Sequence, residues 1–171
     1  ADAGDKKLGF LANVPAQYRD PDGRWYGLTM RARVVYASRE RVPTGSLDSY
    51  LDLAKPEWKG RICTRPGDHP YNLGLIAGLI HRHGLDATRA WLRGVKANLA
   101  QKPQGNDRSQ VKGIHEGLCD VSLGNTYYMG KMLADPKEKA WADAVYLVFP
   151  DQGGAGTHVN VSGATVLRTA P

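Results

Sequence analysis

The stretch CDVSLGNTYYMG, residues 119–130, decides how this chain is expected to fold and where a ligand would bind. Its apolar run at residues 121–123 predicts a short buried strand. Residues 124–126 then predict a turn and the start of a helix, which continues with helix-forming residues. Two adjacent tyrosines, Tyr127 and Tyr128, are thereby placed in the first turn of a helix, directly after the carboxyl end of a strand.

This placement suits the binding of a hard metal ion. Ligands of open α/β sheets tend to bind where the strands end. A helix N-terminus favours negative charge, so it lowers the cost of ionising a phenol. Phenolate oxygen is a hard anionic donor that suits a hard trivalent cation such as Fe(III). The alternative, which is the commoner arrangement for an arbitrary Tyr-Tyr pair, is that one ring packs in the core and the other faces solvent.

Composition is that of an ordinary globular domain. The chain has 171 residues, of which 42% are hydrophobic and 23% are charged. No apolar run approaches the roughly 20 residues that a membrane helix needs. No signal peptide is recognisable, so we expect the chain to be cytosolic or already processed. The net charge of +6 permits binding to nucleic acid, but the basic residues are scattered among acids, and we expect no nucleic-acid partner.

Strand and helix patterns alternate along the chain. Alternation with helices of roughly 10–15 residues predicts an α/β sandwich. A long strand near the start and another at the end flank the rest, which suggests a compact lobe with two connecting strands. Strands are expected at residues 25–38, 61–65, 121–123, 144–149 and 159–169, and helices at 46–53 with Ser46 as N-cap, 71–83 with Gly84 as its stop, 86–100, 108–116, 127–134 and around Trp141.

Three further side chains are candidates for the same site. Tyr71 begins a helix after a strand and a loop, as Tyr127 does, so the phenols would converge on one rim if the two strands are neighbours. Otherwise Tyr71 is a capping aromatic. Arg31 and Arg33 occupy alternate positions of one strand, so both point to one face. There they would bind a carboxylate or carbonate, or keep phenolates ionised. The alternative is that both face solvent.

The two cysteines leave two possibilities open. Cys63 and Cys119 each lie in or beside an expected strand, and their spacing fits no zinc pattern. Neighbouring strands would bring them together as a disulfide, worth on the order of 4 kcal/mol for so long a loop. Two free buried thiols are the other possibility. A bridge would imply an oxidising compartment such as the periplasm.

Nothing in the sequence indicates an enzyme. There is no glycine-rich phosphate loop and no hydrolase elbow. Asp107 and Glu116 stand as isolated carboxylates, so nothing pairs carboxyl groups for acid–base work. The histidines show no metal-ligand clustering and are expected to be structural or exposed: His69, His81, His83, His115 and His158.

Several segments resemble the ferric-iron-binding periplasmic proteins that feed ABC transporters, a family of the type II periplasmic-binding-protein fold. They occur in the family's order and cover the chain from about residue 20 to residue 171. The segments are DPDGRWYG (20–27), LTMRARV (28–34), GRIC (60–63), HPYN (69–72), QGND (104–107), residues 119–129 and GTHVNVSG (156–163).

The resemblance implies a function and a set of site residues. Tyr127 and Tyr128 would bind Fe3+, and Tyr71 would match a third tyrosine ligand. Arg31 would correspond to the family's arginine near the iron and a synergistic anion such as carbonate. We expect Arg33, from the same strand, to help balance the charge. The cysteines fall where a subset of the family has a disulfide. The protein would deliver iron to an inner-membrane permease, and the alternative is a binding protein of the same fold for another small anion or solute.

One departure from the family concerns its amino-terminal lobe, which supplies a further ligand from an early segment that is missing here. We therefore expect mostly the carboxy-terminal lobe, as a three-layer α/β sandwich with a mixed sheet, flanking helices and hinge strands. Surface normally covered by the other lobe could support a dimer. The expected divisions are a linker or lobe remnant at residues 1–19, a hinge strand at 20–38, the lobe at 39–155 and a returning hinge strand at 156–171.

Overall fold

The computed structural model describes residues 13–165 and 167, which form two compact units. The larger unit is Ala32–Val159, and the smaller unit combines the residues up to Arg31 with those from Asn160 onward. The expectations for residues 1–12, for 166 and for 168–171 lie outside the described residues.

The sheet is mixed. Its strand order is β2-β3-β1-β4, and β5 pairs with β1. β1 runs antiparallel to both β3 and β4, whereas β2 and β3 are parallel. Because β2 and β3 are parallel neighbours, their carboxyl ends lie at the same edge of the sheet. The strands are β1 (Tyr26–Ser38), β2 (Ile62–Cys63), β3 (Val121–Asn125), β4 (Val145–Val148) and β5 (Val159–Ala164).

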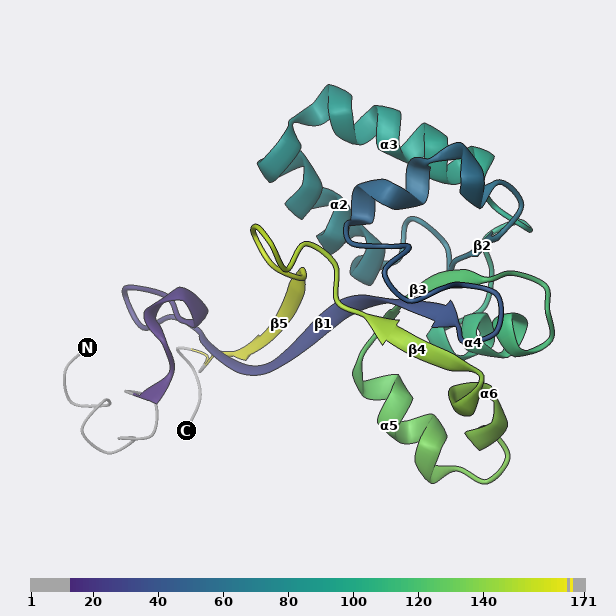
Figure 1. Cartoon of the computed structure of the whole chain (residues 1–171). Coiled ribbons are helices and arrows are strands. Elements are labelled where there is room, and N and C mark those ends of the chain that lie inside the picture. The colour runs from purple at the N-terminus through teal and green to yellow at the C-terminus, as the bar shows by residue number, and fades with distance from the viewer. Residues whose placement is uncertain (1–12, 166, 168–171) are drawn as a thin grey trace. The chain divides into compact units, whose positions relative to one another are not determined.

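Helices of the larger unit cover both faces of this sheet (Figure 1). Alternate residues of β1 enter two separate cores: Val35 and Ala37 pack in one, and Val34 and Tyr36 pack in the other. The first core includes residues of α2 (Pro70–His83), α3 (Leu85–Ala97) and the 3-10 helices η3 (Tyr50–Ala54) and η4 (Pro56–Trp58); the second includes residues of α4 (Asp107–His115), α5 (Tyr127–Ala134) and α6 (Lys139–Asp143). The predicted α/β lobe, with a mixed sheet and flanking helices, is confirmed. A further 3-10 helix, η2 (Ala16–Tyr18), belongs to the smaller unit.

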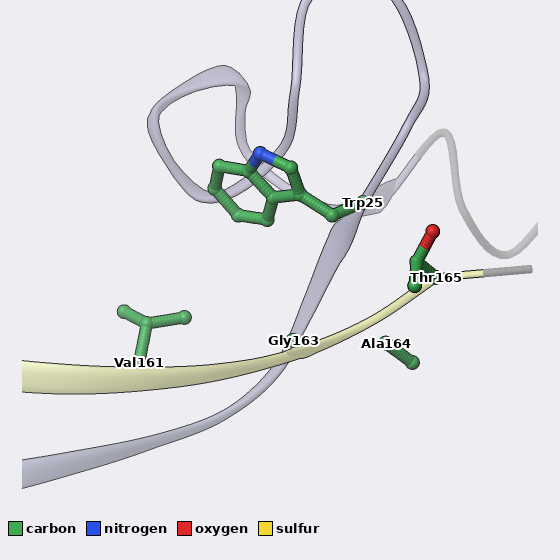
Figure 2. A pocket seen from close by; sticks show the side chains of 5 residues that line it. All are labelled: Trp25, Val161, Gly163, Ala164 and Thr165. Carbon is green, nitrogen blue, oxygen red and sulfur yellow. The ribbon is translucent and has the colours of Figure 1, made fainter.

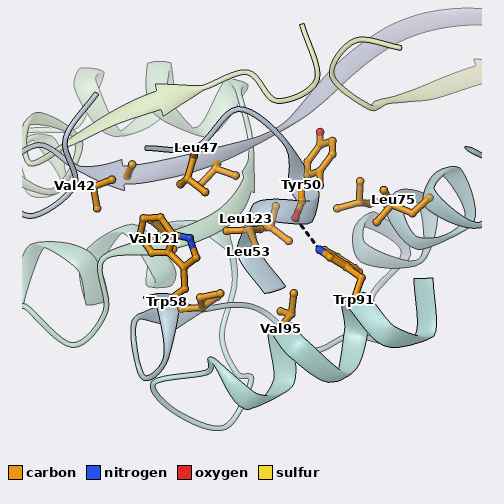
Figure 3. Packing of buried hydrophobic residues seen from close by; sticks show 14 residues of the cluster. Val42, Leu47, Tyr50, Leu53, Trp58, Leu75, Trp91, Val95, Val121 and Leu123 are labelled. Carbon is orange, nitrogen blue, oxygen red and sulfur yellow. Dashed lines mark hydrogen bonds between the residues drawn. The ribbon is translucent and has the colours of Figure 1, made fainter. Parts of the chain in front are cut away.

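The first core joins the helices through polar as well as apolar contacts (Figure 3). The indole Nε1 of Trp91 donates to the backbone oxygen of Tyr50 at 2.7 Å. The hydroxyl of Tyr50 in turn donates to the backbone oxygen of Arg33 in β1. α3 is thereby connected through η3 to the strand that carries a candidate site residue.

The helix predicted at residues 46–53 is wrong in its position and type. The chain forms a 3-10 helix over Tyr50–Ala54, capped by Ser49. Ser46 donates instead to the backbone oxygen of Pro43 at 2.7 Å. The Asp52 carboxylate accepts from the backbone nitrogen of Ser49 at 2.8 Å, which fixes the start of the helix there.

The turn predicted at residues 124–126 is also wrong, because β3 continues through Asn125. Gly124 pairs with Val34 in β1. A Cβ atom on Gly124 would lie 2.2 Å from Cε2 of Tyr36, so the absence of a side chain lets that ring pack against the strand.

The strand predicted at residues 61–65 is shorter than expected. It covers only Ile62–Cys63, because the chain leaves the sheet after Cys63.

The open question about the cysteines is settled in favour of a disulfide. Cys63 and Cys119 are bonded, with their Cα atoms 5.8 Å apart. The bridge packs next to Gly113 of α4, where a Cβ would lie in ordinary contact with both sulfur atoms at 3.7 Å. Among the residues described, no helix has the length and apolar character needed to cross a membrane.

Candidate functional site

The first element of the site is the start of α5. β3 ends at Asn125, and the backbone nitrogen of Thr126 donates to the backbone oxygen of Ala32 at 3.1 Å. The helix begins one residue later with Tyr127 and Tyr128. Their rings are neighbours, with centroids 4.2 Å apart and planes tilted by 33°. Both side chains are half-buried. The alternative, in which one ring packs in the core and the other faces solvent, is therefore wrong.

Tyr71 reaches the same place from α2. His69 caps this helix, because its Nδ1 accepts from the backbone nitrogen of Tyr71 at 3.2 Å. The two rings also make an edge contact at 4.6 Å between centroids. The hydroxyl of Tyr71 is a hydrogen-bonding neighbour of the Tyr127 hydroxyl, as is that of Tyr128. The structure therefore brings the phenols of Tyr71, Tyr127 and Tyr128 together, as expected if β2 and β3 are neighbours.

This grouping affects the acidity of the Tyr127 phenol. Burial raises the pKa of Tyr127 well above its ordinary value, and hydrogen bonding with Tyr128 and Tyr71 adds to the increase. Repulsion from neighbouring phenolates acts in the same direction. Without a cation Tyr127 therefore holds its proton, whereas a bound cation would favour its phenolate form.

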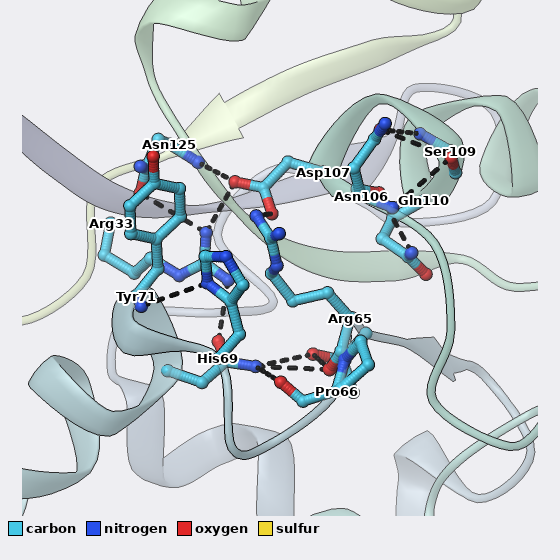
Figure 4. A network of polar contacts seen from close by, with 12 residues as sticks. Arg33, Arg65, Pro66, His69, Tyr71, Asn106, Asp107, Ser109, Gln110 and Asn125 are labelled. Carbon is cyan, nitrogen blue, oxygen red and sulfur yellow. Dashed lines mark hydrogen bonds and ion pairs between the residues drawn. The ribbon is translucent and has the colours of Figure 1, made fainter.

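A buried charge cluster, defined here as Arg33, Arg65 and Asp107, lies against Tyr71 (Figure 4). The guanidinium carbons of Arg33 and Arg65 are 5.9 and 5.1 Å from the centroid of the Tyr71 ring. Asp107 accepts from Arg33 at 2.7 Å and from Arg65 at 3.1 Å. Two guanidinium groups share one carboxylate, so the charge cluster carries a net charge of +1.

Two asparagines complete the surroundings of the charge cluster. Asn72 accepts from Arg33 at 2.7 Å, and Asn125 accepts from the same guanidinium at 3.3 Å. The backbone nitrogen of Asn125 also donates to Asp107 at 2.9 Å. Burial lowers the pKa of Arg33, and attraction to Asp107 opposes that shift. The side-chain Nε atoms of Arg33 and Arg65 have no hydrogen-bond acceptor within the part of the chain that the structure describes.

The two arginines predicted to bind an anion are placed in different surroundings. Arg33 is fully buried, so the alternative that it faces solvent is wrong, and its counter-ion is the internal carboxylate of Asp107. Arg31 belongs to the smaller unit, where it donates to the hydroxyl of Ser162. A role for either residue in binding an external anion stays a prediction.

Sequence reasoning missed the role of Asp107, and its description as an isolated carboxylate is wrong. A signal was present: Asn106 caps α4 by accepting from the backbone nitrogen of Ser109 at 3.0 Å, which places Asp107 in the first turn of that helix. Arg65 was also overlooked, although it lies two residues beyond the end of β2, at the edge of the sheet where ligands tend to bind. The expected structural role of His69 agrees with its capping of α2.

Other parts of the described chain offer less for ion binding. The smaller unit has a hollow of about 340 Å³ lined by uncharged residues (Figure 2): Trp25, Val161, Gly163, Ala164 and Thr165. Over residues 13–165 and 167 there is also no group of three His, Cys, Asp or Glu side chains that could hold a metal. The three neighbouring phenols of Tyr71, Tyr127 and Tyr128 are therefore the strongest candidate site among the described residues.

The polar side chains of this α/β lobe gather at the carboxyl ends of adjacent strands, where ligands of open α/β sheets tend to bind. Comparison with known families adds the class of protein. The chain belongs to the family described as bacterial extracellular solute-binding protein, whose pattern matches residues 5–162.

Individual relatives share this chain over about half of their own length. Iron uptake protein A1 of Synechocystis sp. is 47% identical over 161 residues, which cover 93% of this chain and 45% of the relative. The ferric iron-binding protein A of Mannheimia haemolytica, solved in an open conformation, is 53% identical with a TM-score of 0.88, and the match covers 93% of this chain and 50% of that one. A Trichodesmium protein solved with iron and citrate is 41% identical with a TM-score of 0.90, covering 94% and 52% respectively.

Proposed function

We propose that this chain is part of the substrate-binding component of an iron(III) ABC transporter and binds Fe3+ through the phenolates of Tyr71, Tyr127 and Tyr128. The convergence of these phenols at the carboxyl edge of the sheet is the observation that carries the proposal. The protein would work in the periplasm and deliver the ion to an inner-membrane permease. The names of its relatives, and the iron bound in one of them, support this assignment.

The charges of the site suit a ferric ion. Three phenolates would balance the charge of Fe3+, and phenolate is a hard donor that such an ion prefers. The charge cluster adds a net +1 beside Tyr71, so an accompanying anion would be favoured. Carbonate is one such anion. The citrate in the Trichodesmium structure supports the presence of an anion beside iron in this family.

Iron binding should release protons. Because burial and the neighbouring hydroxyls raise the pKa of Tyr127, this phenol is protonated at neutral pH until a cation displaces the proton. Metal affinity is therefore expected to fall as the pH falls, since protons compete with the metal for the same oxygens. Acidification would provide a simple route to release.

The test is a titration with Fe(III) followed by visible absorption. The proposal predicts a phenolate-to-iron charge-transfer band that is lost in the double variant Tyr127→Phe/Tyr128→Phe. Tyr146→Phe is a matched control. The Tyr146 hydroxyl donates to the backbone oxygens of Val42 and Pro43, away from the three candidate ligands. A wild-type chain that gives no band would refute the ligand assignment.

A second titration separates the alternative solutes. Calorimetry of the iron-free chain with phosphate, carbonate and small carboxylates would reveal a protein that binds another anion. Binding of one of these solutes without any binding of Fe(III) would favour the alternative, in which the tyrosines form the walls of an anion site.

A further inference from the structure

The charge cluster of Arg33, Arg65 and Asp107 places two guanidinium groups within 5.9 Å of the centroid of the Tyr71 ring. We propose that Arg65 is a positioning residue for Tyr71, and that its charge sets how strongly the site prefers Fe(III) to Fe(II). This inference rests on the proposed function, since it assigns a residue to the same iron site. It goes beyond that function by giving a role to a side chain that does not touch the metal.

The first argument is geometric. Arg65 follows β2 and is only 9% exposed. Its guanidinium carbon is 5.1 Å from the centroid of the Tyr71 ring, within the usual range of a cation–π contact. Its NH1 group donates to Asp107 at 3.1 Å, which fixes the guanidinium in place. The planar group therefore both supports the phenol ring and brings a positive charge next to it.

The second argument is that one carboxylate connects both tyrosine-bearing segments. Asp107 holds the two guanidinium groups that lie against Tyr71. It also accepts from the backbone nitrogen of Asn125, two residues before Tyr127. The charge cluster is thus joined to α2 on one side and to the start of α5 on the other.

The third argument is electrostatic. Buried charges are screened less than exposed ones, so the net +1 of the charge cluster acts on the ring and on any ion that the ring binds. A cation beside a phenolate draws electrons away from its oxygen and weakens donation to the metal. Fe(III) carries one more positive charge than Fe(II), so it is the form that the charge of Arg65 disfavours more.

Replacing Arg65 with glutamine should shift this balance. The variant Arg65→Gln removes the positive charge and is expected to raise the ratio of Fe(III) to Fe(II) affinity about tenfold, which equals a fall of about 59 mV in the reduction potential of the bound ion. Arg65→Lys keeps the charge and should retain the wild-type potential.

A matched control is available at the other end of β2. Arg61 precedes β2, lies 4.9 Å from the centroid of the Trp58 ring and pairs with Asp120. The variant Arg61→Gln makes the same chemical change at a similar cation–π contact away from the tyrosines. Spectroelectrochemistry of the iron-loaded chain should find the potential of Arg61→Gln unchanged. A wild-type potential in Arg65→Gln, or an equal shift in Arg61→Gln, would overturn the proposal.

An iron-free measurement keeps this inference separate from the proposed function. In chain labelled with 13C at the tyrosine Cζ, the Tyr71 resonance can be assigned with Tyr71→Phe. It should move in Arg65→Gln and stay near its wild-type position in Arg65→Lys and Arg61→Gln. An unmoved Tyr71 resonance in Arg65→Gln overturns the inference even if iron binds, whereas a wild-type chain that gives no ferric band refutes the proposed function instead.

Discussion

Removal of the Asp107 carboxylate is expected to destabilise the fold severely. In Asp107→Ala the side chains of Arg33 and Arg65, which are 0% and 10% exposed, lose the anion that they share. Breaking a buried ion pair by removing one partner costs about 3–5 kcal/mol. Here two cations are left facing each other and the backbone nitrogen of Asn125 loses its acceptor, so the loss should lie near the upper end. Since small domains are stable by only about 5–15 kcal/mol, this is a large fraction of the total.

Urea unfolding followed by tryptophan fluorescence provides the measurement. Asp107→Asn keeps an acceptor for the Asn125 backbone but not the charge, so its loss should fall between that of Asp107→Ala and zero. The control is Asp143→Ala, which removes a pair between Lys139 and Asp143 whose side chains are 56% and 52% exposed. Exposed pairs of this kind contribute about 0–1 kcal/mol. If Asp107→Ala cost no more than Asp143→Ala, the account of the buried charge cluster would be refuted.

Three further changes test other parts of the fold. Gly124→Ala should cost about 3 kcal/mol or more in urea unfolding, because the new Cβ would lie 2.2 Å from the buried Tyr36 ring; Gly130→Ala, with no atom within 4 Å, should be neutral or slightly stabilising. Burial alone would raise the pKa of Asp120, but hydrogen bonds from two arginines outweigh it and lower the pKa below its ordinary value of 3.8. The ionised carboxylate therefore stabilises the fold above about pH 4, and this contribution is lost as the pH falls through the folded pKa. We expect Asp120→Asn to have a lower free energy of unfolding at neutral pH and a smaller decrease of that free energy in acid. Replacing both disulfide cysteines with alanine should cost about 4 kcal/mol at a sequence separation of 56, and a loss below about 1 kcal/mol in calorimetric unfolding would contradict the assigned bridge.

Local patterns were sufficient for most of the architecture. The apolar run that ends in Leu123 and the helix that starts at Tyr127 are visible in the sequence because burial imposes the period of each element. The helix of residues 70–83 was found to within one residue, since Gly84 at φ 83° ends it in a conformation that favours glycine. These are features that a few neighbouring residues determine by themselves.

What the sequence did not reveal depends on distant residues. Asp107 and Arg33 are 74 positions apart, and no local pattern shows that they form a buried pair. Gly124 was predicted to form a turn because glycine usually favours turns. In the structure the requirement is instead close packing against Tyr36 from another strand. At Asp107 and at Gly124 alike, contacts with residues distant in the sequence determine the structure.

The central claim is that Tyr71, Tyr127 and Tyr128 together bind iron, and an anomalous-difference map of the iron-loaded crystal tests it most directly. The account predicts a single strong peak at the iron absorption edge, within bonding distance of all three phenolate oxygens. The peak should disappear in Tyr127→Phe/Tyr128→Phe crystals treated in the same way. A peak bonded to other side chains, or no peak from crystals soaked with Fe(III), would contradict the account.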